Sequence, residues 1–196
     1  MNFKQIILSI VTFFLSIYIL LATAYAQEIK TTITPSNSNA GTVPVTSPTP
    51  IDYQLPYPGM LPDNSLYFLK VVRDNLTAFF LSKPIDKSNF NLMQSDKNVQ
   101  ASYLLVTQQQ GKTLLAFQTF SQAQDYFEQA ILQAQSAKKQ GYSTKDLADK
   151  LSNANQKHEQ ILEALAQTTH QEHSETVQKE LDRATFFAKD IKSLQQ

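Results

Sequence analysis

The feature that most constrains this chain is the helical spacing of apolar residues through its C-terminal two thirds. Between residues 112 and 140, small and aromatic side chains recur at alternating steps of four and three, the period that places them on one helix face. They are Ala116, Phe120, Ala123, Phe127, Ala130, Ala134 and Ala137. No strand-like alternation follows Asn64. We therefore predict an all-α fold, an antiparallel bundle of about four long helices preceded by one short helix.

Capping residues and glycines divide the pattern into helices. Asp86 is expected to cap the first long helix, which stops at Gly111. The second is expected to end at Gly141, and the third to begin at Ser143. The predicted apolar side of the first long helix is Phe90, Met93, Lys97, Ala101 and Leu104/Leu105.

Residues 143–196 contain two apolar stripes that are out of phase. Leu165 and Val177 are twelve steps apart, so at about 100° per residue the apolar face swings by about 120° between them. The four residues that start at Thr169 have the spacing of a capping box. We favour a break at Thr168-Thr169 and a helical hairpin, with one long kinked helix as the alternative.

The N-terminus has the three parts of a secretory signal. Lys4 precedes an apolar run from Ile6 to Leu21, and the small residues Ala24 and Ala26 form an A-x-A site. Residues 1–26 are therefore interpreted as a signal peptide cleaved after Ala26, with an uncleaved membrane anchor as the alternative. Either reading predicts export, to the periplasm, the cell surface or the medium, with a membrane attachment only where the segment is retained.

A spacer and an apolar arm follow the signal. Residues 27–52 are rich in Ser, Thr and Pro and are expected to form a disordered spacer, whereas 53–196 should form the helical domain. Pro58-Gly59 suits a type II turn, because glycine takes the positive φ at low cost. Four apolar arm residues are expected to lie against the helices: Leu55, Tyr57, Met60 and Leu61.

A short helix is predicted over residues 65–82. Asp63 or Asn64 can cap it, and Pro84 is expected to mark its end. Its apolar face is Leu66, Leu69, Val72, Leu76 and Phe79/Phe80. Core packing is the expected role of Phe79-Phe80 and of Phe186-Phe187, whereas an exposed ring would mark a partner-binding or self-association patch.

Composition excludes several classes of function. The chain has 17 basic and 17 acidic residues and no Cys. A nucleic-acid binder needs a clustered basic face, which a chain with this balance does not supply. Without Cys there is no disulfide, no thiolate chemistry and no sulfur-ligated metal. No catalytic motif is present, so we predict a protein that is not an enzyme and has no cofactor.

The arm and the short helix carry a recognisable opening motif. Its residues are Leu55, Pro56, Pro58, Gly59, Leu66, Tyr67, Leu69 and Lys70. With the two helices that follow, the segment 53–140 resembles the exported bacterial family called domain of unknown function 5667. The resemblance implies an extracytoplasmic helical domain in a bacterium, with no catalytic residues to carry over. The additional helices of 143–196 lie outside it.

Three groups of residues are candidate sites. His170 and His173, with nearby glutamates, would share a helix face as two ligands of a metal site, but a solvated polar face is the favoured interpretation. His158 lies on an apolar stripe, which favours a hydrogen-bonded core histidine over a catalytic base. Gly111-Lys112-Thr113 resembles the end of a phosphate-binding loop, but residue 106 is Val where the motif needs Gly.

The sequence therefore predicts a non-enzymatic extracytoplasmic binding or scaffold module of the bacterial envelope. Its expected partner is a protein or an envelope component, and a homo-oligomer is compatible with the pattern. The alternative function is a metal- or small-ligand-binding sensor that uses His170 and His173.

Overall fold

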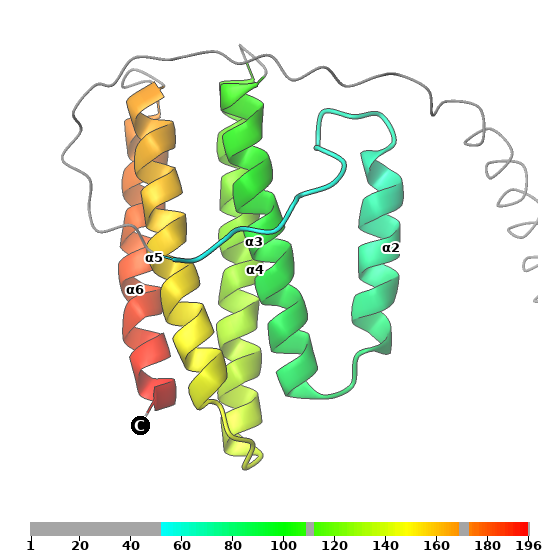
Figure 1. Cartoon of the computed structure of the whole chain (residues 1–196), viewed down its shortest axis with the longest axis vertical. Helices are drawn as coiled ribbons and strands as arrows, with labels where there is room; N and C mark the ends of the chain where they lie inside the picture. The colour runs from blue at the N-terminus through cyan, green and yellow to red at the C-terminus, as the bar shows by residue number, and fades with distance from the viewer. Residues whose placement is uncertain (1–51, 109–111, 169–172, 196) are drawn as a thin grey trace, which may run out of the picture. The chain divides into compact units, whose positions relative to one another are not determined.

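The computed structural model describes residues 52–108, 112–168 and 173–195, which form five helices and no strand (Figure 1). The helices are α2 (Tyr67–Phe80), α3 (Pro84–Thr107), α4 (Thr113–Lys139), α5 (Lys145–Thr168) and α6 (Ser174–Gln195). The all-α prediction is confirmed for this part of the chain. Within it, no helix has the length and apolar character that spanning a bilayer requires. The predicted signal segment and most of the spacer lie outside the described residues.

Two predicted helix boundaries were wrong at the same proline. α2 ends at Phe80, and Pro84 opens α3 as its first residue instead of closing the helix before it. A first-turn proline costs nothing, because its missing N–H would have no partner inside the helix. Lys83 is the N-cap residue, and Asp86 lies in the first turn, where its charge favours the positive end of the helix dipole.

α3 and α4 pack closely along a seam of small residues. Ser88 Oγ donates to the carbonyl of Ala130 at 2.6 Å, and Ser95 Oγ donates to the carbonyl of Ala123 at 2.8 Å. Both sets of small buried residues recur every seven positions: Ser88, Ser95 and Ser102 on α3, and Ala116, Ala123, Ala130 and Ala137 on α4. Because the earlier serine meets the later alanine, the two helices run antiparallel.

The apolar side that was predicted for α3 is confirmed only in part. Ala101 and Leu105 are buried as predicted, but Met93 is exposed. Leu92 and Val99, which were not placed on that side, are buried. The polar middle of α3 is buried too, including Ser95 and Asp96. The prediction was wrong because it counted serine as polar, whereas a serine that donates to a facing carbonyl can line a helix interface.

Two apolar clusters fill the space among α3, α4, α5 and α6. One is built around Phe127, Leu151 and Phe187, and the other around Phe120 and Leu162. α5 and α6 are separate helices that pack against each other, so the hairpin prediction is confirmed. The proposed capping box falls in 169–172, outside the described residues.

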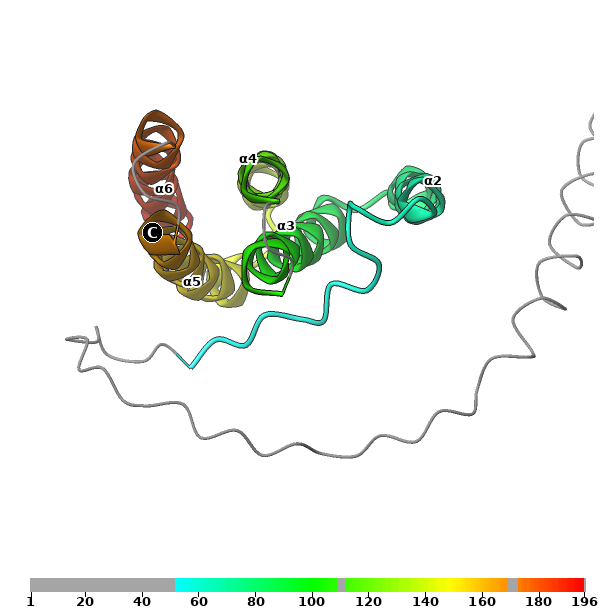
Figure 2. The same ribbon diagram turned by 90° about the horizontal axis from the view of Figure 1, so that it is seen from above.

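α2 lies beside α3, at the edge of the group of described helices (Figure 2). Neither apolar cluster contains an α2 residue among the residues that the structure describes. The loop from Gln140 to Thr144 ends α4 as predicted, with Gly141 at a φ of 83°.

Candidate functional site

The most prominent surface feature is the outward face of α2. Phe79 is 80% exposed, Phe80 73% and Leu76 57%, and the rings of Phe79 and Phe80 meet edge to face with centroids 5.6 Å apart. The remaining members of this exposed apolar stripe are Phe68, Leu69 and Val72. We call these six residues the α2 stripe. Five of the six were predicted to share an apolar face, whereas Phe68 was not placed on it and the predicted member Leu66 is not part of the stripe. The core packing predicted for Phe79-Phe80 was wrong.

A group of polar residues on α2 explains why the stripe faces outward. We call Tyr67, Lys70, Arg73 and Asp74 the Asp74 hook. On the side of α2 nearest α3, Asp74 is buried and accepts from Arg73 Nε at 3.0 Å and Arg73 Nη2 at 2.7 Å. Lys70 Nζ lies 3.9 Å from the same carboxylate and 5.0 Å from the centroid of the Tyr67 ring. Tyr67 Oη donates to Asn98 Oδ1 of α3 at 3.5 Å. α2 therefore turns its polar side inward and leaves the stripe uncovered.

Burial shifts the pKa values around this hook. The pKa of Tyr67 is raised by burial and then by the nearby Tyr126 and Asp74, and the pKa of Tyr126 is raised by burial and Asp74. Burial lowers the pKa of Lys70, although Asp74 acts in the opposite direction. Tyr67, Lys70 and Tyr126 are each half-buried.

The arm before α2 is partly docked, as expected for Leu55, which packs against the second cluster. Pro58 is buried, Gly59 has a φ of 72°, and Met60 is half-buried. Tyr57 was expected to lie against the helices, but it is 81% exposed. Its neighbour Pro58 is the buried residue of this turn. The arm and α2 line a hollow of about 380 Å³ that includes Pro58, Gly59, Leu69 and Lys70.

Leu61 is half-buried in the same arm. Among the other motif residues, Pro56 is half-buried and Leu66 is exposed next to the α2 stripe. Asn64 Oδ1 accepts from the backbone N–H of Leu66 at 2.9 Å in the turn before α2. The N-cap residue is Leu66 and no side chain of the described residues caps the helix, so the predicted cap by Asp63 or Asn64 was wrong.

A buried polar anchor joins the arm to two helices. Tyr53 Oη donates to Asp96 Oδ2 of α3 at 2.6 Å, and His158 Nε2 of α5 lies 2.8 Å from Asp96 Oδ1. His158 has no exposed surface, and its ring centroid lies 5.0 Å from that of Phe127. Its Nδ1 atom is buried and has no hydrogen-bond partner among the residues that the structure describes. The pKa of Tyr53 is raised by burial and by the charge and hydrogen bond of Asp96. The prediction of a hydrogen-bonded core histidine is confirmed.

Both oxygens of the Asp96 carboxylate are engaged by Tyr53 and His158, and each partner is held by packing on the core. Its physical effect is to fasten residue 53 to the helices with charge-assisted hydrogen bonds.

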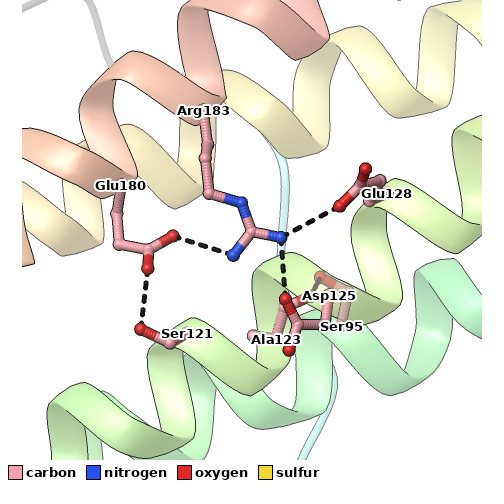
Figure 3. Close-up of polar contacts among 7 residues, drawn as sticks. All are labelled: Ser95, Ser121, Ala123, Asp125, Glu128, Glu180 and Arg183. Carbon is pink, nitrogen blue, oxygen red and sulfur yellow. Dashed lines mark hydrogen bonds and ion pairs between the residues drawn. The ribbon is translucent and has the colours of Figure 1, made fainter.

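A second polar cluster ties α6 to α4 (Figure 3). Arg183 Nη2 donates to Asp125 Oδ1 at 2.8 Å and to Glu128 Oε2 at 3.2 Å, and Nη1 donates to Glu180 Oε2 at 3.2 Å. Ser121 Oγ donates to Glu180 Oε1 at 2.7 Å, so the fully buried Glu180 has partners on both oxygens. Burial alone would lower the pKa of Arg183, but the hydrogen bond to Asp125 and the three carboxylates raise it overall.

An open groove borders this cluster. It measures about 630 Å³ and is lined by Arg183, Lys179, Phe186 and neighbouring residues of α4 and α6. Phe187 is buried as expected, while Phe186 is 58% exposed. The groove presents a single exposed ring, in contrast to the continuous α2 stripe.

The candidate metal and phosphate residues do not converge on a site in the described part of the chain. His170 and Gly111 lie outside the described residues, and His173 packs its ring 4.7 Å from that of Phe117. No group of three or more potential ligands is present among the described residues. Lys112 Nζ instead pairs with Asp63 Oδ2 at 2.7 Å.

Comparison with family models, with curated proteins and with solved structures gave no match. The resemblance to domain of unknown function 5667 over 53–140 therefore stays a prediction. The α2 stripe is the part of the described surface that differs most from the surface of an ordinary monomeric protein.

Proposed function

We propose that this protein is a non-enzymatic extracytoplasmic binding module that associates through the α2 stripe. The observation that carries the proposal is the exposure of the stripe: Phe68, Phe79 and Phe80 together with three aliphatic residues lie in one strip on one helix. Isolated exposed apolar residues are common on soluble proteins, but a contiguous apolar strip marks an interaction surface.

The proposal includes the wider organisation of the chain. Residues 1–26 act as the signal peptide, 27–52 as the spacer, and 53–196 as an antiparallel helical bundle related to domain of unknown function 5667. The Ser95–Ala123 and Ser88–Ala130 contacts support the antiparallel arrangement of two of its helices. Edman sequencing or intact mass of the exported protein tests the cleavage, because a mature chain would begin at Gln27.

Site-specific photocrosslinking tests the binding surface. A photoreactive amino acid at Phe79, in the full chain exported by its native host, should give a discrete covalent adduct with one partner. The same group at Leu132, a 46% exposed residue of α4, serves as the control and should give none. Equal labelling from both positions, or no adduct from position 79, would overturn the proposal.

A further inference from the structure

The order of residues along the α2 stripe has an unusual symmetry. Its members lie six, five and two positions before Asp74 and two, five and six positions after it. In chain order they are Phe68, Leu69, Val72, Leu76, Phe79 and Phe80. A stripe with this mirror spacing matches itself when a second copy of the helix is laid against it in the opposite direction.

In an antiparallel pair of α2 helices, the N-terminal end of one stripe would lie against the C-terminal end of the other. With residue 74 of both copies at the same level, Phe68 of one copy comes level with the Phe79–Phe80 end of the other, and Val72 and Leu76 lie around the centre. Phe68 of one copy is then level with Phe80 of the other, and Phe79 lies one helical rise, roughly 1.5 Å, from that level. Aromatic side chains would meet at both ends of the pair, and apolar contact would continue without interruption between them.

The exposed area also fits a specific interface between two chains. Taking roughly 150–250 Å² for each whole large side chain, the exposed fractions of the stripe amount to about 700 Å². This is more than the largest apolar patch of a typical monomer, about 300–600 Å². Two stripes in contact would remove about 1,400 Å² from water, which is within the usual range of roughly 1,200–2,000 Å².

Charge favours a second copy over an anionic lipid surface. α2 contains two basic residues, Lys70 and Arg73, and both lie against the Asp74 carboxylate, so the helix adds a net charge of only one beside the stripe. A lipid surface is recognised largely through unpaired Lys and Arg. The chain as a whole has 17 basic and 17 acidic residues, so two copies do not repel each other through net charge.

We infer that the α2 stripe is the contact surface of a twofold-symmetric dimer in which two α2 helices pair antiparallel. This inference rests on the proposed function, because it assigns an occupant to the same surface. The dimer is isologous: the same residues of each protomer form the interface, and the contact closes without leading to a filament.

Sedimentation equilibrium of the full chain tests the dimer with a matched pair of variants. Leu76→Glu places a carboxylate at the centre of the stripe, whereas Leu132→Glu makes the same change at an exposed leucine of α4. The wild type and Leu132→Glu should both show twice the chain mass, and Leu76→Glu should raise the dimer dissociation constant at least tenfold, because it buries an unpaired charge. Since all three chains share the same N-terminus, any association through residues 1–26 is common to them.

Cysteine crosslinking tests the direction of pairing, because the chain has no native Cys. A mixture of Phe68→Cys and Phe79→Cys chains should form disulfide-linked heterodimers on oxidation. Phe68→Cys alone should not, because its two copies would stand about 18 Å apart along the helix axis, twelve residues at about 1.5 Å each. Crosslinking of Phe68→Cys to itself would indicate parallel pairing and overturn the inference.

Two further outcomes separate the inference from the proposed function. A wild-type chain that remains monomeric at about 100 μM overturns the dimer, because even a weak specific complex would form at this concentration. If that monomer still gives a photocrosslinked adduct with another protein, or binds phosphatidylcholine–phosphatidylglycerol vesicles in a manner lost in Leu76→Glu, the proposed function stands with a different occupant. If it does neither, both fail.

Discussion

Removing one hydroxyl from the buried anchor should measurably destabilise the protein. Tyr53→Phe keeps the ring that packs on the first apolar cluster and deletes only the donor that lies 2.6 Å from Asp96 Oδ2. A hydrogen bond to a charged group contributes about 1.5–3 kcal/mol to the free energy of unfolding. Asp96 then keeps His158 as its only partner in the anchor, and its second oxygen loses its protein donor.

The assay is urea unfolding of the full chain, followed by circular dichroism, with Tyr57→Phe as the control. Tyr57 is 81% exposed, so losing its hydroxyl should change the free energy of unfolding by less than about 0.5 kcal/mol. For Tyr53→Phe we expect a loss of about 1.5–3 kcal/mol with an unchanged m-value. A Tyr53→Phe chain as stable as the control would refute the assignment of the arm as fastened by this anchor.

The pH dependence of the same pair provides an independent check. Burial and Asp96 raise the pKa of Tyr53 in the folded protein above the ordinary tyrosine value of about 10. A group whose folded pKa is raised contributes stability that is fully present below the unfolded pKa and decreases as pH rises above it. The stability difference between wild type and Tyr53→Phe should therefore be constant from pH 7 to 9 and shrink above pH 10. A difference that grows with pH would contradict the geometry.

Stability measurements also test the arm as a whole, the Arg183 cluster and the seam between α3 and α4. A chain that begins at Asp63 should melt several degrees below one that begins at Asp52, because it lacks the docked arm; equal melting temperatures would show that the arm is only linker. Arg183→Met should lower the free energy of unfolding in urea by about 2–4 kcal/mol, because it leaves the buried Glu180 without its cation; a loss below 0.5 kcal/mol would mean that Ser121 alone suffices. Ser95→Leu should cost about 1–3 kcal/mol in the same assay by forcing α3 away from α4, and a neutral result would contradict the close seam.

Helical periodicity was enough to predict the class of fold and most helix limits, but not what each face meets. The spacing that identified Leu76 and Phe79 as one face is the same for a buried and an exposed helix. What turned the face outward is the polar side of α2, where Asp74 is buried and Tyr67 donates to Asn98 of α3, a contact that depends on tertiary structure. Spacing therefore predicted five of the six residues of the stripe, all but Phe68, and missed their exposure.

The buried anchor shows a second limit of local reasoning. His158 was correctly interpreted as a hydrogen-bonded core residue because it lies on an apolar stripe. Its partner Asp96 lies 62 residues earlier, in a segment that looked like an interruption of the apolar side of α3. The seven-residue recurrence of serine in α3 and alanine in α4 was a signal in the sequence, but it becomes informative only when the two repeats are set against each other.

The three contacts of the anchor and the seam also imply an order of assembly. Ser95 and Ala123 are 28 residues apart, whereas Tyr53 and Asp96 are 43 apart and Asp96 and His158 are 62 apart. Shorter loops close at a lower entropic cost, so α3 and α4 should meet first and form the surface on which α5 docks. By the same measure Tyr53 reaches Asp96 next, and His158, with the longest separation, arrives last. The arm would therefore already lie on α3 when α5 docks and covers the second oxygen of the Asp96 carboxylate.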